Sequence, residues 1–234
     1  MALSFLGYFN GLTALFLVIF GFSMGIYFLY RFFKTKKSLL PLVAVLMFML
    51  GLFYSGPMTS FLALLFGTPI DGILYAYLSY SLMPLTIIVA MILGFDIFKH
   101  EWRFHVLWVY IPLAIAFWIL FYAFPDISFE YPDITPDELM DISFIGICLI
   151  ITGFYLLSTL VILAGGFMFL ARKIRGTPEF KKTVSLGIGW FFFGLSGILD
   201  ALLSEKIPFM IAPARALMIA AYILIFIGFR PSRN

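Results

Sequence analysis

Charged side chains are scarce in this chain of 234 residues: Asp, Glu, Lys and Arg make up 12%, while 63% of the residues are hydrophobic. A soluble domain of this size needs a polar surface, so the composition excludes that class. The apolar runs are continuous, not alternating, and are long enough to cross a hydrocarbon core of about 30 Å as helices, which excludes a β-barrel. The sequence therefore predicts an all-α, multi-pass integral protein of the cell membrane.

Side chains that carry chemistry are equally scarce. Cys148 is the one cysteine, so no internal disulfide can form. The two histidines, His100 and His105, lie in one short connection and do not supply a zinc site within the apolar runs. No serine and histidine are placed to act as nucleophile and base. We therefore expect no catalytic residues, no metal site and no enzyme activity.

Seven apolar runs follow one another, at residues 5–32, 39–67, 73–95, 104–124, 142–171, 183–203 and 209–229. The connections 33–38, 96–103 and 172–182 and the segment after the last run carry the basic residues, whereas 125–141 is acidic. Because cytoplasmic loops hold the excess of Lys and Arg, the N-terminus is expected outside and the C-terminus inside. The prediction is one domain, 1–234, a bundle of seven transmembrane helices. The net charge of +3 therefore reflects topology, and no nucleic-acid partner is expected.

Glycine and proline predict close contacts and kinks within these runs. Gly21 and Gly25 are four apart and allow another helix to approach closely, within this bundle or in a dimer. Pro57 interrupts the second run, for which we favour one kinked helix over a helix ending near residue 54 and a second, short outer helix. Pro84 and Pro112 predict kinks in the middle of the third and fourth helices.

Two helix starts are open to interpretation. Residues 135–138 read Thr-Pro-Asp-Glu, a pattern typical of a helix N-terminus, so the fifth helix is expected to begin there and enter the membrane near Ile142. The last helix starts either at Phe209 or at Pro213. The first start places Arg215 well inside the membrane, and the second places it in the first turn, where it can reach the headgroups.

Apart from Arg31 at the very end of the first run, Arg215 is the only Lys or Arg inside an apolar run, and Asp200 lies near the end of the run before it. A charge in hydrocarbon costs at least a few kcal/mol, so such residues usually pair, line a wet cavity or reach the interface. The two residues predict either a structural ion pair between the last two helices or a site for an anionic or zwitterionic ligand. A retinal cofactor is not expected, because the last run contains no lysine for a Schiff base.

Further polar and aromatic residues recur at helical spacing in the outer halves of the runs. The third helix carries Asp71, Tyr75 and Ser79, the fifth carries Thr152, Tyr155 and Thr159, and the sixth carries Trp190; Tyr222 lies seven residues after Arg215, and Asn10 and Thr13 lie on the first helix. Such residues form ordinary hydrogen bonds between helices or, taken together, line an outward-facing pocket between the third, fifth, sixth and seventh helices.

The sequence resembles a group of archaeal seven-helix membrane proteins without assigned activity. The resemblance is carried by Gly197-Ile-Leu-Asp200 at the end of the sixth run, by Arg215 and by residues 222–229. In topology it is similar to rhodopsin-like receptors and to the seven-helix sensory modules of kinases. It implies the seven-helix fold and a sensing role, and it assigns no ligand.

Three functions are left open by the sequence. The first is a receptor-like sensor that binds a small or lipidic ligand in the outward pocket and passes its signal to a cytoplasmic protein at the basic loops 33–38 and 172–182. The second is a transporter or channel for a small solute, which needs a polar path to the inner face. The third is a non-catalytic accessory subunit that packs against another membrane protein.

Overall fold

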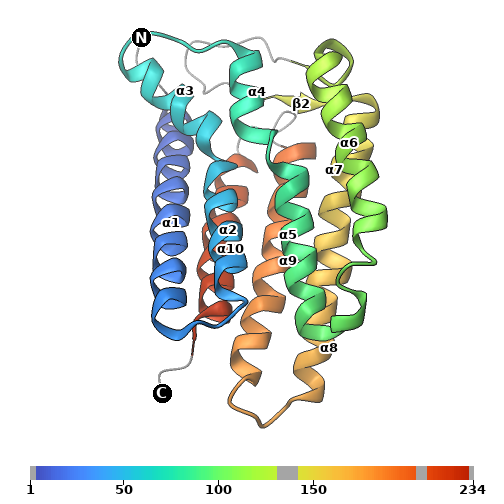
Figure 1. The fold of residues 1–234 in the computed structure, drawn as a ribbon. Helices are drawn as coiled ribbons and strands as arrows, with labels where there is room; N and C mark the ends of the chain where they lie inside the picture. Colours follow the sequence, from blue (N-terminus) through green and yellow to red (C-terminus); the bar gives the residue numbers. More distant parts are fainter. Residues whose placement is uncertain (1–3, 131–141, 204–209, 232–234) are drawn as a thin grey trace.

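A computed structural model describes residues 4–130, 142–203 and 210–231, with side chains of 201–203 excluded. The described residues form an up-and-down helical bundle with one two-stranded antiparallel sheet at one end (Figure 1). In chain order the elements are α1 Phe5–Thr35, α2 Leu40–Leu52, α3 Ser55–Leu65, α4 Gly72–Tyr80, α5 Met83–Phe98, η1 His100–Trp102, α6 Leu107–Ala123, η2 Pro125–Ile127, β1 Phe129–Glu130, β2 Ser143–Phe144, α7 Gly146–Ser158, η3 Thr159–Ala164 (a π-helix), α8 Gly165–Lys173, α9 Phe180–Leu203 and α10 Ile211–Phe229.

The all-α class and the apolar character of the helices are confirmed. Among the described residues, five helical stretches are long and apolar enough to cross a membrane, and the pair α2 and α3 makes a sixth if it is one bent span. The helix α6, with 17 residues, is a shorter apolar helix. Seven spans and their orientation stay predictions.

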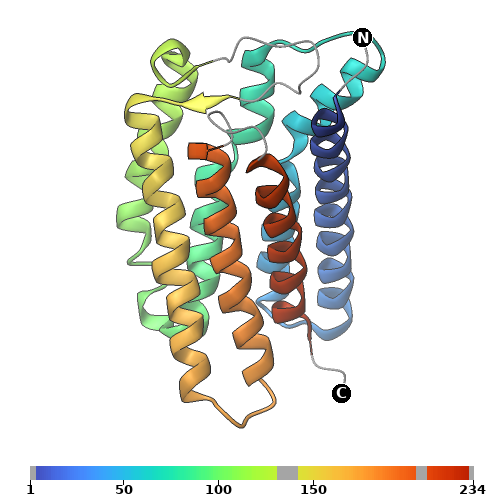
Figure 2. The same ribbon diagram turned by 180° about the vertical axis from the view of Figure 1, so that it is seen from behind.

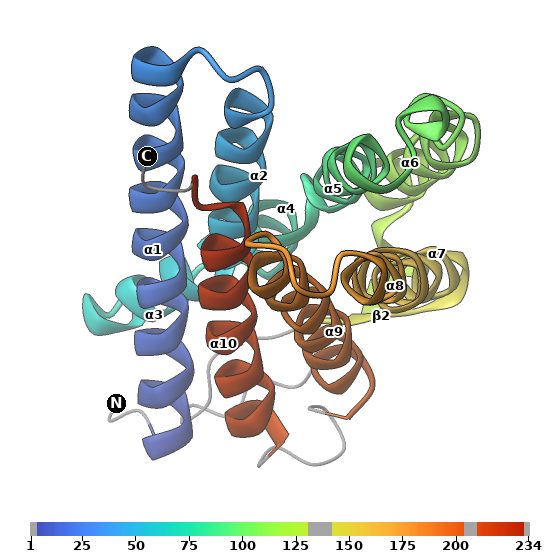
Figure 3. The same cartoon turned by 90° about the horizontal axis from the view of Figure 1, so that it is seen from below.

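Figures 2 and 3 show how the helices pack. The helix α10 lies between α1 and α9, and α9 packs in turn against η3 and α8. The helix α2 lies against α1, and α6 is at the far edge of the bundle beside α5 and α7. The close approach expected at Gly21 is made to α2 within the chain, since a Cβ added at Gly21 would lie 2.6 Å from the Cα of Gly51.

Two helices are broken a few residues before a proline. The helix α2 ends at Leu52, and α3 continues at an angle of 41° before reaching Pro57. The helix α4 ends at Tyr80, and Pro84 lies in the first turn of α5, not in the middle of a helix. Proline has no N–H to donate to the carbonyl four residues earlier, so each break falls where that bond would have formed. Pro112, in contrast, stays inside α6.

Side chains from other helices bind the carbonyls that these breaks release. The Ser55 hydroxyl donates to the Leu78 carbonyl of α4 at 2.6 Å, and the Trp118 indole donates to the Ser81 carbonyl at 2.8 Å. The Tyr222 hydroxyl of α10 donates to the Leu50 carbonyl of α2. Carbonyls without water in a hydrocarbon core must be satisfied by the protein, so these bonds stabilise the breaks.

The fifth run, expected to be helical from residue 142, is helical only from Gly146. Ser143 and Phe144 form β2, paired with Glu130 and Phe129 of β1, and α7 begins only at Gly146, which has a positive φ of 55°. The helix start expected at residues 135–138 lies outside the described residues. The helix α10 begins at Ile211, between the two expected starts, and Pro213 is in its first turn.

Candidate functional site

Arg215 lies in the second turn of α10 and is 2% exposed. Its Nη1 donates to Asp200 Oδ2 on α9 at 2.9 Å, and its Nε donates to Asn10 Oδ1 on α1 at 2.7 Å. The guanidinium carbon also lies 4.9 Å from the centre of the Tyr54 ring. Four segments of the bundle therefore meet at one cation.

These partners explain why an arginine is accepted in this position. A buried guanidinium needs an opposite charge and further acceptors, and its planar fork can bind several groups at once. The Asp200 side chain, at 20% exposed, is less buried than its partner. The structure thus contains the ion pair that was one of the two expectations for Asp200 and Arg215.

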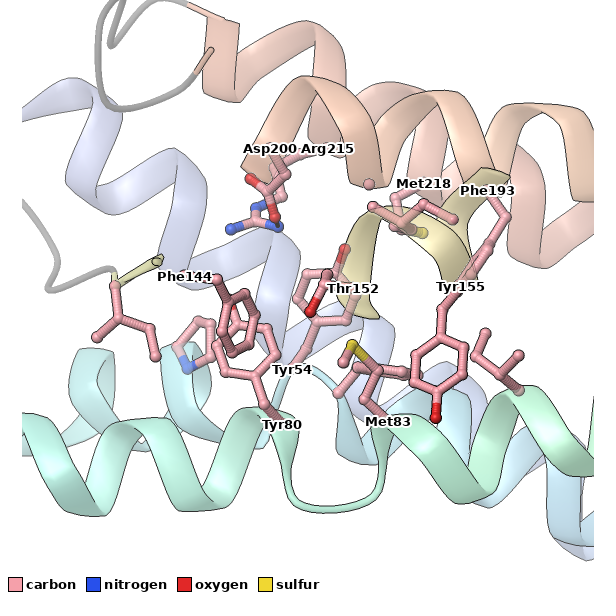
Figure 4. A pocket seen from close by; sticks show the side chains of 16 residues that line it. Tyr54, Tyr80, Met83, Phe144, Thr152, Tyr155, Phe193, Asp200, Arg215 and Met218 are labelled. Atoms are coloured by element: carbon pink, nitrogen blue, oxygen red, sulfur yellow. Dashed lines mark hydrogen bonds and ion pairs between the residues drawn. The ribbon is translucent and has the colours of Figure 1, made fainter. Parts of the chain in front are cut away.

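A cavity of about 80 Å³ lies beside this ion pair (Figure 4). Asp200 and Arg215 lie side by side at its edge, and aromatic rings and two methionines form much of the remaining wall. Its lining residues come from six segments: Phe53, Tyr54 and Pro57; Tyr80, Met83 and Ile87; Ile142 and Phe144; Thr152, Tyr155 and Leu156; Phe193, Gly197 and Asp200; Arg215 and Met218. We call this space the Arg215 cavity.

Both helix breaks open onto the Arg215 cavity. Phe53 and Tyr54 are the two residues between α2 and α3, and Tyr80 and Met83 flank the break between α4 and α5. The Tyr80 ring also meets Phe144 of β2 edge-on, with centroids 4.8 Å apart. Movement of either broken helix would therefore change the shape of the cavity.

Two buried hydroxyls in the cavity wall make no hydrogen bond within the described residues. Thr152 is 4% exposed and Tyr155 is 0% exposed, and neither Thr152 Oγ1 nor the Tyr155 hydroxyl has a partner there. Buried polar groups are normally hydrogen-bonded to protein, water or ligand. The cavity exceeds the roughly 10–15 Å³ that one water needs, so water or a small polar molecule fits beside them.

The structure brings four of the expected residues to this cavity, Thr152, Tyr155, Asp200 and Arg215. Asp71 precedes α4 as its N-cap, and its side chain is exposed. Tyr75 and Ser79 are buried in α4, where a Cβ added at Gly56 of α3 would lie 1.9 Å from Ser79 Oγ. Tyr75 and Ser79 therefore belong to the packing between α3 and α4, whereas Asp71 lies outside it.

The other expected residues are buried outside the cavity lining. Thr159 donates to the Leu156 carbonyl at 2.7 Å, in the π-helix. Trp190 of α9 contacts the Phe193 ring edge-on at 5.5 Å, and Tyr222 binds the end of α2 as described above. The Tyr222 bond joins two helices, as the alternative of ordinary hydrogen bonds expects, whereas the contacts given for Thr159 and Trp190 lie within a single helical stretch.

Most of the cavity wall was not predicted. The sequence gives no signal for Phe53, Tyr54, Tyr80 and Met218, because the chain has 30 Phe, 12 Tyr and 11 Met and none of these stands out. Asn10 was noted as a polar residue in the first run, but its bond to Arg215, 205 residues away, could not be read from local spacing.

The basic connections lie together at the other end of the bundle, with the C-terminus (Figure 1). There Asp96 Oδ1 contacts Arg103 Nη1 at 2.8 Å and His100 Nδ1 at 2.7 Å. Within the described ranges, no three His, Cys, Asp or Glu side chains gather in a way that could hold a metal ion.

Comparison with protein families, curated proteins and solved structures found no match to this chain.

Proposed function

We propose that the chain is a seven-helix membrane protein, with its N-terminus outside and its C-terminus inside, that senses a small ligand in the Arg215 cavity. The observation that carries this proposal is a buried ion pair at the edge of an aromatic cavity that both helix breaks line. An ion pair with only a structural role would need neither this cavity nor the buried hydroxyls of Thr152 and Tyr155, which a ligand or water could bind.

The arrangement of charge supports the orientation. The connections between α1 and α2, between α5 and α6 and between α8 and α9 are all at the end that also holds the C-terminus (Figure 1). Positive charge favours the cytoplasmic side. The Arg215 cavity is toward the opposite, outer end, next to β2.

The cavity chemistry supports a small anionic or zwitterionic ligand with an apolar part. Arg215 provides a cation, Asp200 an anion, and Thr152 and Tyr155 provide hydroxyls, while the rest of the wall is mainly aromatic and aliphatic. A volume of about 80 Å³ is far below the roughly 300–1,000 Å³ of pockets for drug-sized ligands. A small molecule therefore fits this conformation better than a lipid does.

The helix breaks supply a means of response. A ligand shifts a conformational equilibrium only through contacts that differ between the two states. A molecule that fills the space between Tyr54 and Tyr80 would favour one setting of α3 against α2 and of α4 against α5. The change would reach the cytoplasmic partner expected at residues 33–38 and 172–182 along α2 and α5, which run to the basic end.

Native mass spectrometry of the full chain in mild detergent tests the proposal. We expect a small molecule bound at one per chain, retained in Thr86→Val and weakened by about tenfold in Thr152→Val and Tyr155→Phe. Thr86 is a matched control, because it is a buried threonine in α5 outside the cavity lining. A bound molecule lost equally from all three variants, or no bound molecule, would contradict the proposal.

A further inference from the structure

A second hollow opens at the basic end of the bundle, at the opposite end from the Arg215 cavity. It has a volume of about 700 Å³ and is bounded by the connection between α1 and α2 and by α2, α5, α8, α9 and α10. Seen from this end, α2 and α5 lie on one side, and α8, α9 and α10 on the other (Figure 3). We call it the basic-end groove.

Three cations from three distant parts of the sequence meet at the mouth of this groove. Lys37 precedes α2, Lys182 lies in the first turn of α9, and Arg230 directly follows α10. Among the described residues that line the groove, Glu179 is the one acidic residue, so cations outnumber anions there by three to one. The electrostatic field at the mouth therefore favours an anion.

The wall becomes apolar with depth. Leu40 and Val43 follow Lys37 along α2, and Leu186 is one turn further into α9 than Lys182. Leu93 and Ile97 of α5 face them in the same groove. An occupant that matches this order carries its negative charge at the end of the bundle and an apolar part toward its middle.

We propose that the basic-end groove binds one anionic phospholipid, with its phosphate at Lys37, Lys182 and Arg230 and its apolar part against α2 and α5. Helix ends of a membrane protein are at the headgroup level, and basic pockets between helices at that level bind anionic lipid headgroups. The proposal rests on the membrane placement given above, but it does not require a ligand in the Arg215 cavity.

A lipid matches the groove better than a free phosphate ion does. Inorganic phosphate would use the three cations and leave the accessible apolar wall, exposed Leu39 and half-buried Ile97 and Leu170, without a partner. Burial of apolar surface contributes roughly 25 cal/mol per Å², so an occupant with hydrocarbon binds more tightly than its headgroup alone. The two sources of phosphate are therefore distinguishable by affinity.

The test is a lipid titration of the full chain in mild detergent, followed by native mass spectrometry. Phosphatidylglycerol is expected to bind at one site, and phosphatidylcholine much more weakly. A triple variant, Lys37→Gln, Lys182→Gln and Arg230→Gln, is expected to bind phosphatidylglycerol at least about tenfold more weakly. The control triple, Lys34→Gln, Lys36→Gln and Arg172→Gln, removes equal charge from exposed residues at the same end that do not line the groove, and should keep the site.

Three results would overturn the proposal. Equal losses in the two triple variants would show diffuse attraction to the basic end. Glycerol 3-phosphate that displaces the lipid at equal concentration would show a site for phosphate alone. A peptide of acidic and leucine residues that outcompetes the lipid would assign the groove to a protein segment. Circular dichroism of both variants checks that their helices are intact, and ligand binding in the Arg215 cavity is measured separately.

Discussion

The helix α10 has an arginine near each end, and the two are used in opposite ways. Arg215, in its second turn, is 2% exposed and is held by Asp200, Asn10 and the Tyr54 ring. Arg230, directly after the helix, is exposed at the mouth of the basic-end groove. An arginine side chain therefore links helices inside the bundle at position 215, and at position 230 it is an exposed surface charge.

The structure around Arg215 also differs from the structure around Arg230. Near Arg215, the helices α2 and α3 and the helices α4 and α5 are separated by breaks, and the strand β2 and an aromatic-lined cavity lie at this end of the bundle. Around Arg230 the helices α5, α8 and α9 run without a break to short basic connections. The comparison teaches that removal of charge should be costly at the Arg215 end of α10 and cheap at its Arg230 end.

Arg215→Ala should give the largest effect. It leaves Asp200 and Asn10 without their main partner, and removal of one member of a buried ion pair costs about 3–5 kcal/mol. The measurement is reversible unfolding in mixed detergent, with the wild-type chain alongside. A loss below about 1 kcal/mol would mean that Arg215 is solvated in the folded protein.

Tyr222→Phe should have an intermediate effect. It removes the hydroxyl that donates to the Leu50 carbonyl. In a continuous helix that carbonyl would accept from the Tyr54 N–H, but here the Tyr54 N–H donates to the Gly51 carbonyl instead. An unsatisfied buried acceptor costs about 1–3 kcal/mol. Tyr122→Phe, on an exposed tyrosine of α6, is the matched control. Equal stability of the two variants would show that water replaces the Tyr222 hydroxyl.

The double change Asp200→Leu and Arg215→Met should be milder than Arg215→Ala alone. Replacement of both members of a buried ion pair by apolar residues of similar volume is often close to neutral, although Asn10 still loses its partner here, at about 1 kcal/mol. The same unfolding assay measures the stability, and binding to the Arg215 cavity should be lost. A double variant as unstable as the single one would mean that the bond to Asn10 dominates.

Arg230→Gln should have the smallest effect on stability, within about 0.5 kcal/mol, since exposed surface substitutions rarely exceed that value. Thermal unfolding of the variant checks this. A large loss would show that Arg230 is a structural residue, and would weaken the contrast between the two ends of α10.

The sequence predicts helix positions well because the length of an apolar run is a local property. Pro57 and Pro84 also marked the two interrupted helices, but the breaks fall several residues earlier, where the proline nitrogen would have bonded. Pro112 shows that the same residue can remain inside a helix when its surroundings allow it. Break positions depend on donors such as Ser55 and Trp118 from neighbouring segments.

The candidate site was predictable only where it is chemically unusual. Arg215 and Asp200 stood out because charges are rare in apolar runs, and they do meet. Tyr54 and Phe144 did not, because an aromatic residue in an aromatic-rich chain gives no contrast, and the position of Phe144 depends on its pairing with Phe129, 15 residues earlier in the sequence. The packing of the helices decides which aromatic and aliphatic side chains line a cavity, and the spacing of residues along the sequence does not reveal that packing.

The π-helix Thr159–Ala164 has a consequence for how this chain tolerates length changes. A π turn holds one residue more than an α turn, so it acts as a single-residue insertion absorbed into the helix. Upstream, Thr152 and Tyr155 face the Arg215 cavity, and downstream, Leu170 and Ile174 face the basic-end groove. Deletion of one residue from this turn would make the helix uniformly α and leave the facing of the two parts nearly unchanged, whereas a deletion in the α-helical part on either side would rotate one part against the other by about 100°. The π turn is therefore the place in this helix where the loss of one residue would disturb the two cavities least.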